Sequence, residues 1–427
     1  MVRDPRPALR RLARWLLAPP DSLRKGPFEP GAFPSRLRSE RLTSLLGIAL
    51  GVAFAVCFGT GLLSHLIQHP PGWFWWPSRP VGLYRFTQGL HVATGLACVP
   101  LLGAKLWSVY PRLFTWPPVR SLAHAAERGS VALLVAAALF QVLSGVLNVA
   151  HWYAPMPFFF TTGHYRVAWL VAGAILVHIG VQLPVVRAAL RRPPRAVPAG
   201  DPAVDGPPID RADCVPGVGS AGSADVAGTQ RRRLLVAVGA AVGLITVTTA
   251  GQTIRPLDAL ALLAPRRPDL GPQGLPVNKT AAAAGTSVLD MSAYRLVVDG
   301  PGGSVELDLA ALNGLPQHAV DLPITCVEGW SADARWSGVR LADLVRQVGA
   351  DPRHASVLVE SLEAGGRYRS STVAAPHTRD PATLIALRLN GEVLHPDHGY
   401  PARLIAPNRP GVLQTKWVGR LTVRAES

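Results

Sequence analysis

The chain has 427 residues, of which 48% are hydrophobic and only 16% are charged. Soluble domains usually carry about 25% charged residues, and the mean hydropathy of +0.22 is also high, so we do not expect a wholly soluble protein. Four cysteines are too few for a disulfide framework, and their spacings match no zinc motif. The net charge of +16 comes from basic residues that flank long apolar runs, which is typical of membrane proteins and argues against a nucleic-acid partner.

Five apolar stretches predict membrane-spanning helices. The first four have the ~20 residues that are needed to cross the hydrocarbon core of a bilayer, and the fifth is at the lower limit. None of the five contains Asp or Glu. The predicted spans are Thr43–Leu66, Leu83–Trp107, Ser130–Ala150, Val167–Val186 and Leu234–Ala250.

The loops between the spans predict their orientation. Basic residues are concentrated after the second and fourth spans, whereas the loops after the first and third spans are aromatic, as is typical of the membrane–water interface. We therefore expect a multi-pass protein of the cell membrane, in contact with lipid, with a cytoplasmic N-terminus and an extracytoplasmic C-terminal part.

Two segments outside the spans contain few apolar residues that a folded core could bury. Residues 1–42 are basic and rich in proline and predict a cytoplasmic tail, and residues 191–232 are rich in Pro, Gly and Ala and predict a disordered cytoplasmic linker. The segment Thr229–Leu235, before the fifth span, resembles a twin-arginine export signal. Ordinary positive flanking of a span explains it equally well.

From residue 252 onward the pattern changes to short apolar runs separated by Gly, Pro, Asn and Asp, which predict strands, and Leu341–Val348 predicts one amphipathic helix. The fold class that follows is multidomain. An all-α transmembrane bundle of four helices over 43–190 and a fifth, tethering span over 233–251 precede an α+β, β-rich domain over 252–427. The predicted strands are Tyr294–Val298, Val305–Leu309, Ser356–Val359, Leu384–Leu389, Arg403–Ile405 and Leu421–Val423.

Four histidines of the predicted bundle are candidate ligands of haem iron, because imidazole is a usual haem ligand and a polar side chain within a span is costly. His91 and His178 lie deep in the second and fourth spans, and His65 and His164 lie at the outer ends of the first and fourth. His164 and His178 are 14 residues apart, so they share one face of a helix at two depths. The alternative for the outer histidines is an interfacial role, with hydrogen bonds to water.

This pattern over residues 43–190 resembles bacterial cytochrome b membrane subunits of the kind attached to formate dehydrogenases. The resemblance implies one or two haem b groups, with the quinone pool or another membrane electron donor as the redox partner. The sequence departs from the family in the first span, where the only nearby histidines lie at the outer end.

Cys326 is the candidate metal ligand of the C-terminal domain. It follows a short apolar run, and a thiolate at the end of a strand could bind a soft metal, although composition alone favours a packing role. Two groups of motifs resemble the molybdopterin oxidoreductases of the sulfite oxidase family. They are Leu315–Val320, Ile324–Trp330 and Trp336–Leu341 around the cysteine, and His395–Leu404 with Thr415–Val418 near the C-terminus.

The resemblance to this family implies a molybdopterin cofactor with molybdenum ligated by Cys326. It also implies that His398, Arg403 and Lys416 hold the pyranopterin and its phosphate, since Arg and Lys form charge-assisted hydrogen bonds to phosphate. His318 and Thr415 lie within the matching motifs and are further candidate cofactor-binding residues.

The arrangement Cys326-Val327-Glu328 is similar to that of the catalytic subunit of periplasmic protein-methionine-sulfoxide reductases. This resemblance implies that Glu328 is a catalytic residue together with Cys326, and that Asn278 lies near the metal. A carboxylate at position 328 would repel a sulfite dianion and would suit a neutral substrate or proton delivery. Leu387 also stands where the family has a tyrosine near the metal.

The sequence therefore predicts a membrane-bound molybdenum oxidoreductase that takes electrons from haem b and the quinone pool. It is expected to reduce a neutral oxidised group, such as a sulfoxide, on a small-molecule or protein-bound substrate outside the membrane. Two alternatives stay open: a sulfite dehydrogenase that runs in the oxidative direction, and a non-catalytic membrane electron-transfer protein.

Overall fold

The computed structural model describes residues 26, 29, 32–33, 35, 37–115, 119–191, 221–264, 266, 270–287 and 290–425. The chain divides into two compact units. One contains residues 1–55, 96–144 and 161–244, and the other contains residues 56–95, 145–160 and 245–427. Most of the predicted tail over 1–42 and of the predicted linker over 191–232 lies outside the described residues.

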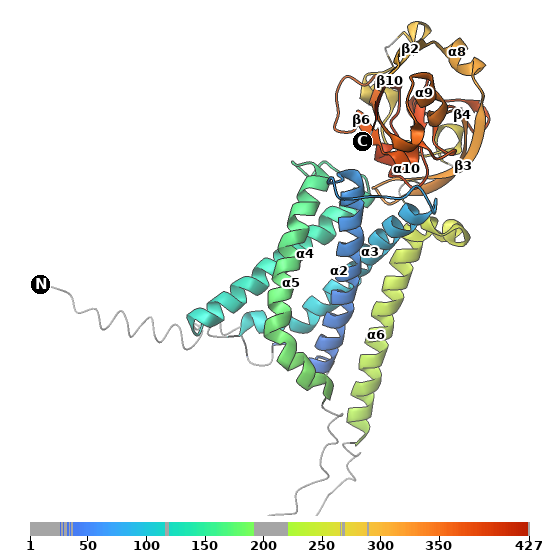
Figure 1. Cartoon of the computed structure of the whole chain (residues 1–427). Helices are drawn as coiled ribbons and strands as arrows, with labels where there is room; N and C mark the ends of the chain where they lie inside the picture. The colour runs from blue at the N-terminus through green and yellow to red at the C-terminus, as the bar shows by residue number, and fades with distance from the viewer. Residues whose placement is uncertain are drawn as a thin grey trace, which may run out of the picture. The chain divides into compact units, whose positions relative to one another are not determined.

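Five long helices in the described part of the chain correspond to the five predicted spans, and all five are long and apolar enough to cross a membrane (Figure 1). The helices run beyond the predicted spans, because polar residues that lie outside the hydrocarbon core continue the same helical backbone. They are α2 (Glu40–Gln68), α3 (Leu83–Val109), α4 (Leu122–Val149), α5 (Phe160–Arg191) and α6 (Ala221–Ala250).

The fifth helix differs from its prediction. Because α6 begins at Ala221, the predicted disordered linker does not hold for residues 221–232. No proline occurs between Pro216 and Pro256, so the helical backbone of α6 can extend towards the N-terminus through this polar stretch without losing a hydrogen bond.

The C-terminal domain contains two sheets, which confirms the predicted β-rich fold. The first sheet has the order β2-β1-β10-β5-β6, in which only the β1–β10 pair is parallel. The second has the order β3-β4-β7-β8, and β9 also pairs with β7. The strands are β1 (Leu296–Gly300), β2 (Gly303–Leu307), β3 (His318–Thr325), β4 (Ser331–Arg340), β5 (Ala355–Ser361), β6 (Ser370–Val373), β7 (Leu384–Leu389), β8 (Glu392–Val393), β9 (Arg403–Ile405) and β10 (Val418–Ala425).

Both sheets contribute to one core, which also buries the apolar face of α9 (Leu341–Gln347). Leu296, Val357 and Leu421 come from the first sheet, and Val339 and Ile385 come from the second; none of these side chains is more than 1% exposed. A smaller core packs around Trp336 and includes Cys326. The candidate metal ligand is therefore carried by the second sheet.

Two local differences from the predicted strands have physical causes. β2 ends at Leu307 because Asp308 caps a short helix, α8 (Leu309–Gly314), by accepting a hydrogen bond from the Ala311 amide at 2.7 Å. The predicted strands do not include β3, β4, β6 or β8, although a strand end was expected before Cys326. Pro323 interrupts β3, and β4 is rich in Ala, Ser and Gly, which have weak strand propensity.

Gly338 tests the register between β4 and β7, since a Cβ atom there would lie 2.1 Å from the carbonyl oxygen of Ile385. We expect Gly338→Ala to lower the free energy of unfolding by about 1–3 kcal/mol through overpacking, and thus to lower the thermal midpoint of the full chain in detergent. Gly365→Ala is the matched control, because no atom lies within 4 Å of its added Cβ. Equal midpoints for the two variants would contradict the register.

Candidate functional site

Cys326 follows the last residue of β3 and opens a tight loop to Trp330. The Cys326 amide donates to the Trp330 carbonyl at 2.9 Å, and the Gly329 amide donates to the Cys326 carbonyl at 3.1 Å. Gly329 has a φ of +96°, a backbone conformation that disfavours any side chain. The loop therefore fixes the thiol, which is only 1% exposed, at one end of the second sheet.

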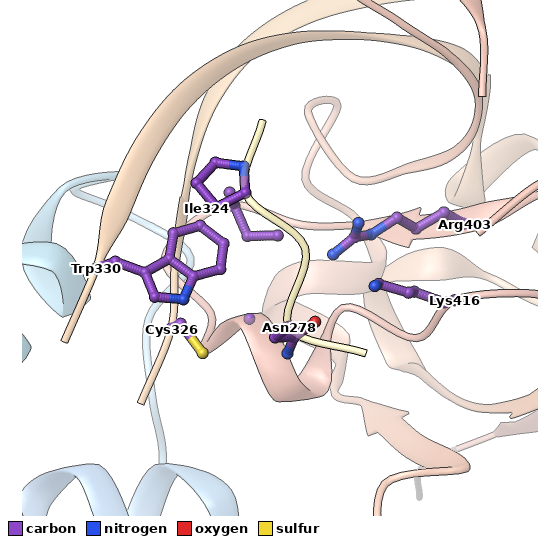
Figure 2. A pocket seen from close by; sticks show the side chains of 8 residues that line it. Asn278, Ile324, Cys326, Trp330, Arg403 and Lys416 are labelled. Atoms are coloured by element: carbon purple, nitrogen blue, oxygen red, sulfur yellow. The ribbon is translucent and has the colours of Figure 1, made fainter. Parts of the chain in front are cut away.

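A pocket of about 240 Å³, including its open mouth, lies beside this loop. Figure 2 shows Arg403 and Lys416 extending towards this space from one side and Cys326 and Trp330 lying on the other, with Asn278 between them. Four of the lining residues were predicted from the sequence as site residues. Ile324 and Trp330 lie at the two ends of the motif around Cys326, and Pro276 and Gly411 were not predicted. The lining residues are Pro276, Asn278, Ile324, Cys326, Trp330, Arg403, Gly411 and Lys416.

Arg403 and Lys416 are the cations of this pocket. Arg403 is 2% exposed, and burial lowers the pKa of its guanidinium to about 9. Lys416 Nζ donates to the carbonyl oxygens of Asp397 (2.7 Å) and Lys279 (2.9 Å), and burial, followed by the charge of Arg403, holds its pKa well below the usual range. Among the described residues, neither cation forms a salt bridge with a carboxylate.

His398 and Thr415 are buried and are not among the residues that line the pocket. His398 Nε2 donates to the Pro272 carbonyl at 2.7 Å, and the His398 carbonyl accepts from Arg403 Nη1 at 3.2 Å. Burial, followed by the charge of Arg403, lowers the pKa of His398 to about 4, so the imidazole is neutral at pH 7. Thr415 Oγ1 lies 2.8 Å from Ser371 Oγ. His398 thus supports the Arg403 side chain through its backbone carbonyl, and Thr415 directly precedes Lys416 in the chain.

The structure does not bring His318 to the pocket. This residue begins β3, whereas Cys326 follows the other end of the same strand, and eight strand residues span about 25 Å. Its Nε2 atom lies 3.9 Å from the Asp343 carboxylate. Leu387, the position compared with a tyrosine near the metal, is buried in the main core of the domain.

The Glu328 carboxylate is held by three nitrogen atoms that lie around one oxygen. Its Oε2 is 2.9 Å from His151 Nε2, 3.0 Å from Trp330 Nε1 and 3.2 Å from Arg266 Nε. Burial opposes ionisation of this carboxyl, but the hydrogen bond and charge of His151 and the charge of Arg266 outweigh it and hold the pKa of Glu328 below its usual range. The negative charge of Glu328 is therefore compensated within the site, which weakens the expectation that it repels an anionic substrate.

The sequence analysis did not connect His151 or Arg266 with the site. His151 lies in the loop between α4 and α5, and 177 positions separate it from Glu328. A contact between two residues that are so far apart in the sequence produces no local sequence pattern. Only a tertiary contact can identify it.

Cys326 has the properties of a metal ligand that is neutral until the metal binds. Burial, followed by the negative charge of Glu328, raises the pKa of the Cys326 thiol well above its usual range. A bound metal cation reverses this preference, since a coordinating thiol is deprotonated.

The donor set also fits the phosphate end of a pterin cofactor. Within the described part of the chain, the buried donor Arg403 Nε has no hydrogen-bond partner. Buried polar groups normally have partners, so an anionic ligand with acceptor oxygens would satisfy the wall that Arg403 and Lys416 form.

The histidines of the helices divide between the two units. His91 Nδ1 lies 2.8 Å from the Cys57 carbonyl oxygen, and an added Cβ at Gly61 would lie 2.7 Å from the His91 ring. His65 contacts His69, with ring centroids 4.9 Å apart and ring planes inclined by 56°. In the other unit, His164 Nδ1 lies 3.0 Å from Ser144 Oγ, and His178 lies on α5.

Among the residues that the structure describes, no group of three or more His, Cys, Asp or Glu side chains is placed to hold a metal ion. A haem iron bound by two histidines needs no such group. Haem ligation by His91 and His178, with His65 and His164 as further candidate ligands, therefore stays a prediction.

Comparisons with known proteins identify the C-terminal domain. Residues 283–427 match the family described as oxidoreductase molybdopterin binding domain. The mitochondrial sulfite oxidases of Rattus norvegicus and Homo sapiens are 33% and 31% identical over 165 residues, which cover 32% of this chain and 30% of each oxidase. An NADH nitrate reductase of Brassica napus is 35% identical over 97 residues, which cover 21% of this chain and 11% of the reductase.

The sulfane dehydrogenase SoxCD of Paracoccus pantotrophus is a solved structure with a weak likeness, at 23% identity and a TM-score of 0.29, over 32% of this chain and 40% of that one. The chain spans less than a third of the length of the sulfite oxidases that it matches. The C-terminal part of the chain, residues 283–427, is a molybdopterin-binding oxidoreductase domain of the sulfite oxidase family.

Proposed function

We propose that the chain is a membrane-bound molybdenum oxidoreductase that passes electrons between haem b in its helices and an extracytoplasmic substrate, with reduction of a sulfoxide as the reaction. One observation carries the proposal. A single buried thiol, Cys326, lines the same pocket as two cations, Arg403 and Lys416, that form no salt bridge with a carboxylate of the described chain. A thiol for the metal and cations for the phosphate are the donors that a molybdopterin requires.

In this proposal different residues of the pocket bind different parts of the cofactor. Cys326 supplies the thiolate ligand, Arg403 and Lys416 bind the phosphate, and Asn278 contacts the cofactor from the facing segment of the pocket wall. When bound, the cofactor supplies a metal centre that accepts or donates two electrons. The substrate sulfoxide takes up two electrons and two protons and leaves as a thioether and water.

The lining of the pocket supports a neutral substrate. Among the described residues, Arg403 and Lys416 are the cations that line the pocket, and the cofactor phosphate would occupy them. The remaining lining side chains are uncharged, and Pro276, Ile324 and Trp330 present apolar surface that suits a thioether body. A dianion would find no further lining cation to compensate its charge.

Sulfite oxidation is the second candidate reaction, because the relatives at 33% and 31% identity are sulfite oxidases. The compensation of Glu328 by Arg266 and His151 removes the electrostatic objection that the sequence raised against an anion. A purely electron-transferring protein without chemistry is disfavoured, since the site retains Cys326, Arg403 and Lys416 together.

Haem b and the quinone pool are the proposed electron source within the membrane. The hydrogen bond from His91 Nδ1 to the Cys57 carbonyl supports this role, because it favours the tautomer whose lone pair lies on Nε2, the nitrogen that would ligate iron. The charges of the loops support an extracytoplasmic position for the molybdenum domain and a cytoplasmic N-terminus.

Cys326→Ser tests the metal ligand. The two side chains have similar volume, so we expect the thermal midpoint to be retained. We expect turnover to fall by more than about a hundredfold, since a serine oxygen is a harder and poorly ionised ligand. Activity near that of the natural protein would remove Cys326 from the site.

His91→Ala and His178→Ala test the haem. Each is expected to abolish the reducible low-spin spectrum of one haem b, because an iron that loses an axial imidazole changes spin state. His124→Ala, in α4, is the control and should leave the optical spectrum unchanged. A full low-spin spectrum in His178→Ala would show that this residue is not a ligand.

The reaction is tested with dithionite-reduced, full-length protein in detergent after the excess reductant is removed. We expect a sulfoxide, such as dimethyl sulfoxide or methionine sulfoxide, to reoxidise the haem, and we expect sulfite to reduce oxidised haem poorly. Rapid haem reduction by sulfite without any response to sulfoxides would reverse the assignment and establish the oxidative direction.

A further inference from the structure

The carboxylate of Glu328 joins three segments that are distant in the sequence. Trp330 belongs to the cysteine loop itself, Arg266 belongs to the chain between α6 and the first sheet, and His151 belongs to the loop between α4 and α5. All three side chains lie in the same compact unit as Glu328. Their nitrogen atoms converge on a single oxygen, Oε2, at 2.9–3.2 Å.

The backbone of His151 is held in the position that this contact needs. His151 has a φ of +55°, which is uncommon for a residue other than glycine. Its amide donates to the Asn148 carbonyl at 3.1 Å, and the next amide, that of Trp152, donates to the Leu147 carbonyl at 2.9 Å. The C-terminal turn of α4 thus fixes the residue that contacts Glu328.

Arg266 connects this contact to the facing wall of the pocket. Its Nε atom lies 3.2 Å from Glu328 Oε2 and 3.2 Å from His151 Nε2, and its Nη1 atom donates to the carbonyl of Val277, the residue before Asn278. The cysteine loop itself is further held by α3 and α4, since the Val327 carbonyl accepts from Gln88 Nε2 at 3.2 Å and from Asn148 Nδ2 at 3.5 Å.

We infer that His151 is a positioning residue of the molybdenum site: it holds the Glu328 carboxylate beside Cys326, so a loop between two membrane helices completes the site of the C-terminal domain. The inference rests on the proposed function. Glu328 follows the thiolate ligand Cys326 by two positions, with only Val327 between them, so the position of its carboxylate sets the negative charge that the metal experiences. Release of the carboxylate from His151 would change the electronic environment of the metal and not only the fold.

A double-mutant cycle on the full-length protein in detergent tests this role. The variants are His151→Ala, His151→Gln, Glu328→Ala and the double variant His151→Ala with Glu328→Ala. His354→Ala is the matched control, because this histidine also contacts a carboxylate, Asp351, at 3.4 Å, but is 73% exposed. Molybdenum content, thermal midpoint, the electron paramagnetic resonance signal of Mo(V), kcat and KM are measured for each.

We expect His151→Ala to keep its molybdenum and its thermal midpoint, to shift the Mo(V) signal, and to lower kcat about tenfold with little change in KM. His151→Gln, whose amide can donate to Glu328, should restore most of kcat and the natural signal. In the Glu328→Ala background, His151→Ala should have no further effect, since a residue that acts through Glu328 loses its target.

Two results would overturn the inference: a Mo(V) signal in His151→Ala like that of the natural protein, or a loss of kcat from His151→Ala that is equal in the presence and absence of Glu328. If all variants contain molybdenum, the proposed function is upheld in either case. Absence of molybdenum from the natural protein would overturn the proposed function, and this inference with it.

Discussion

The burial of two positive charges that have no carboxylate partner in the described chain is the constraint on which the candidate site depends. Removal of a cation from water costs several kcal/mol unless other groups replace the hydration. Backbone carbonyls of Asp397, Lys279 and His398 supply part of that replacement to Arg403 and Lys416. The close approach of these segments also requires Gly399, where an added Cβ would lie 3.0 Å from Lys416 Cβ. A phosphate would supply the remaining acceptors, so the cofactor and the wall of the pocket stabilise each other.

The cysteine on the other side of the pocket is positioned by parts of the chain that the sequence assigned to separate domains. Gln88 and Asn148 donate to the carbonyl of Val327, Gln252 donates to that of Gly329, and Arg85 forms a salt bridge of 2.8 Å with Asp333. An added Cβ at Gly329 would lie 2.9 Å from Val92, the residue after the candidate haem ligand His91. The compact unit that contains the molybdopterin domain accordingly includes residues 56–95 and 145–160, whereas the composition placed the boundary at 252.

Sequence reasoning succeeded where a signal is local. Long apolar runs predicted α2 to α6, and short ones predicted β7 and β9 with their observed bounds and parts of β1, β2, β5 and β10. Motifs with fixed spacing predicted Cys326, Asn278, Arg403 and Lys416, which line one pocket. Sequence reasoning failed where tertiary contacts determine the structure. β3 and β4 form strands despite weak strand propensity, because their partners bury Leu322 and Trp336. His151 and Arg266 contact Glu328 although they are distant from it in the sequence. For the same reason, the charge of Glu328 was interpreted without the cations that compensate it.

The molybdenum content of the purified, full-length natural protein tests the central claim most directly. The account predicts one molybdenum atom per chain, released together with a fluorescent pterin when the protein is denatured, and loss of both in a variant that lacks the positive charges of Arg403 and Lys416. Protein that is folded and carries no molybdenum when it is produced in cells that make the cofactor would contradict the account.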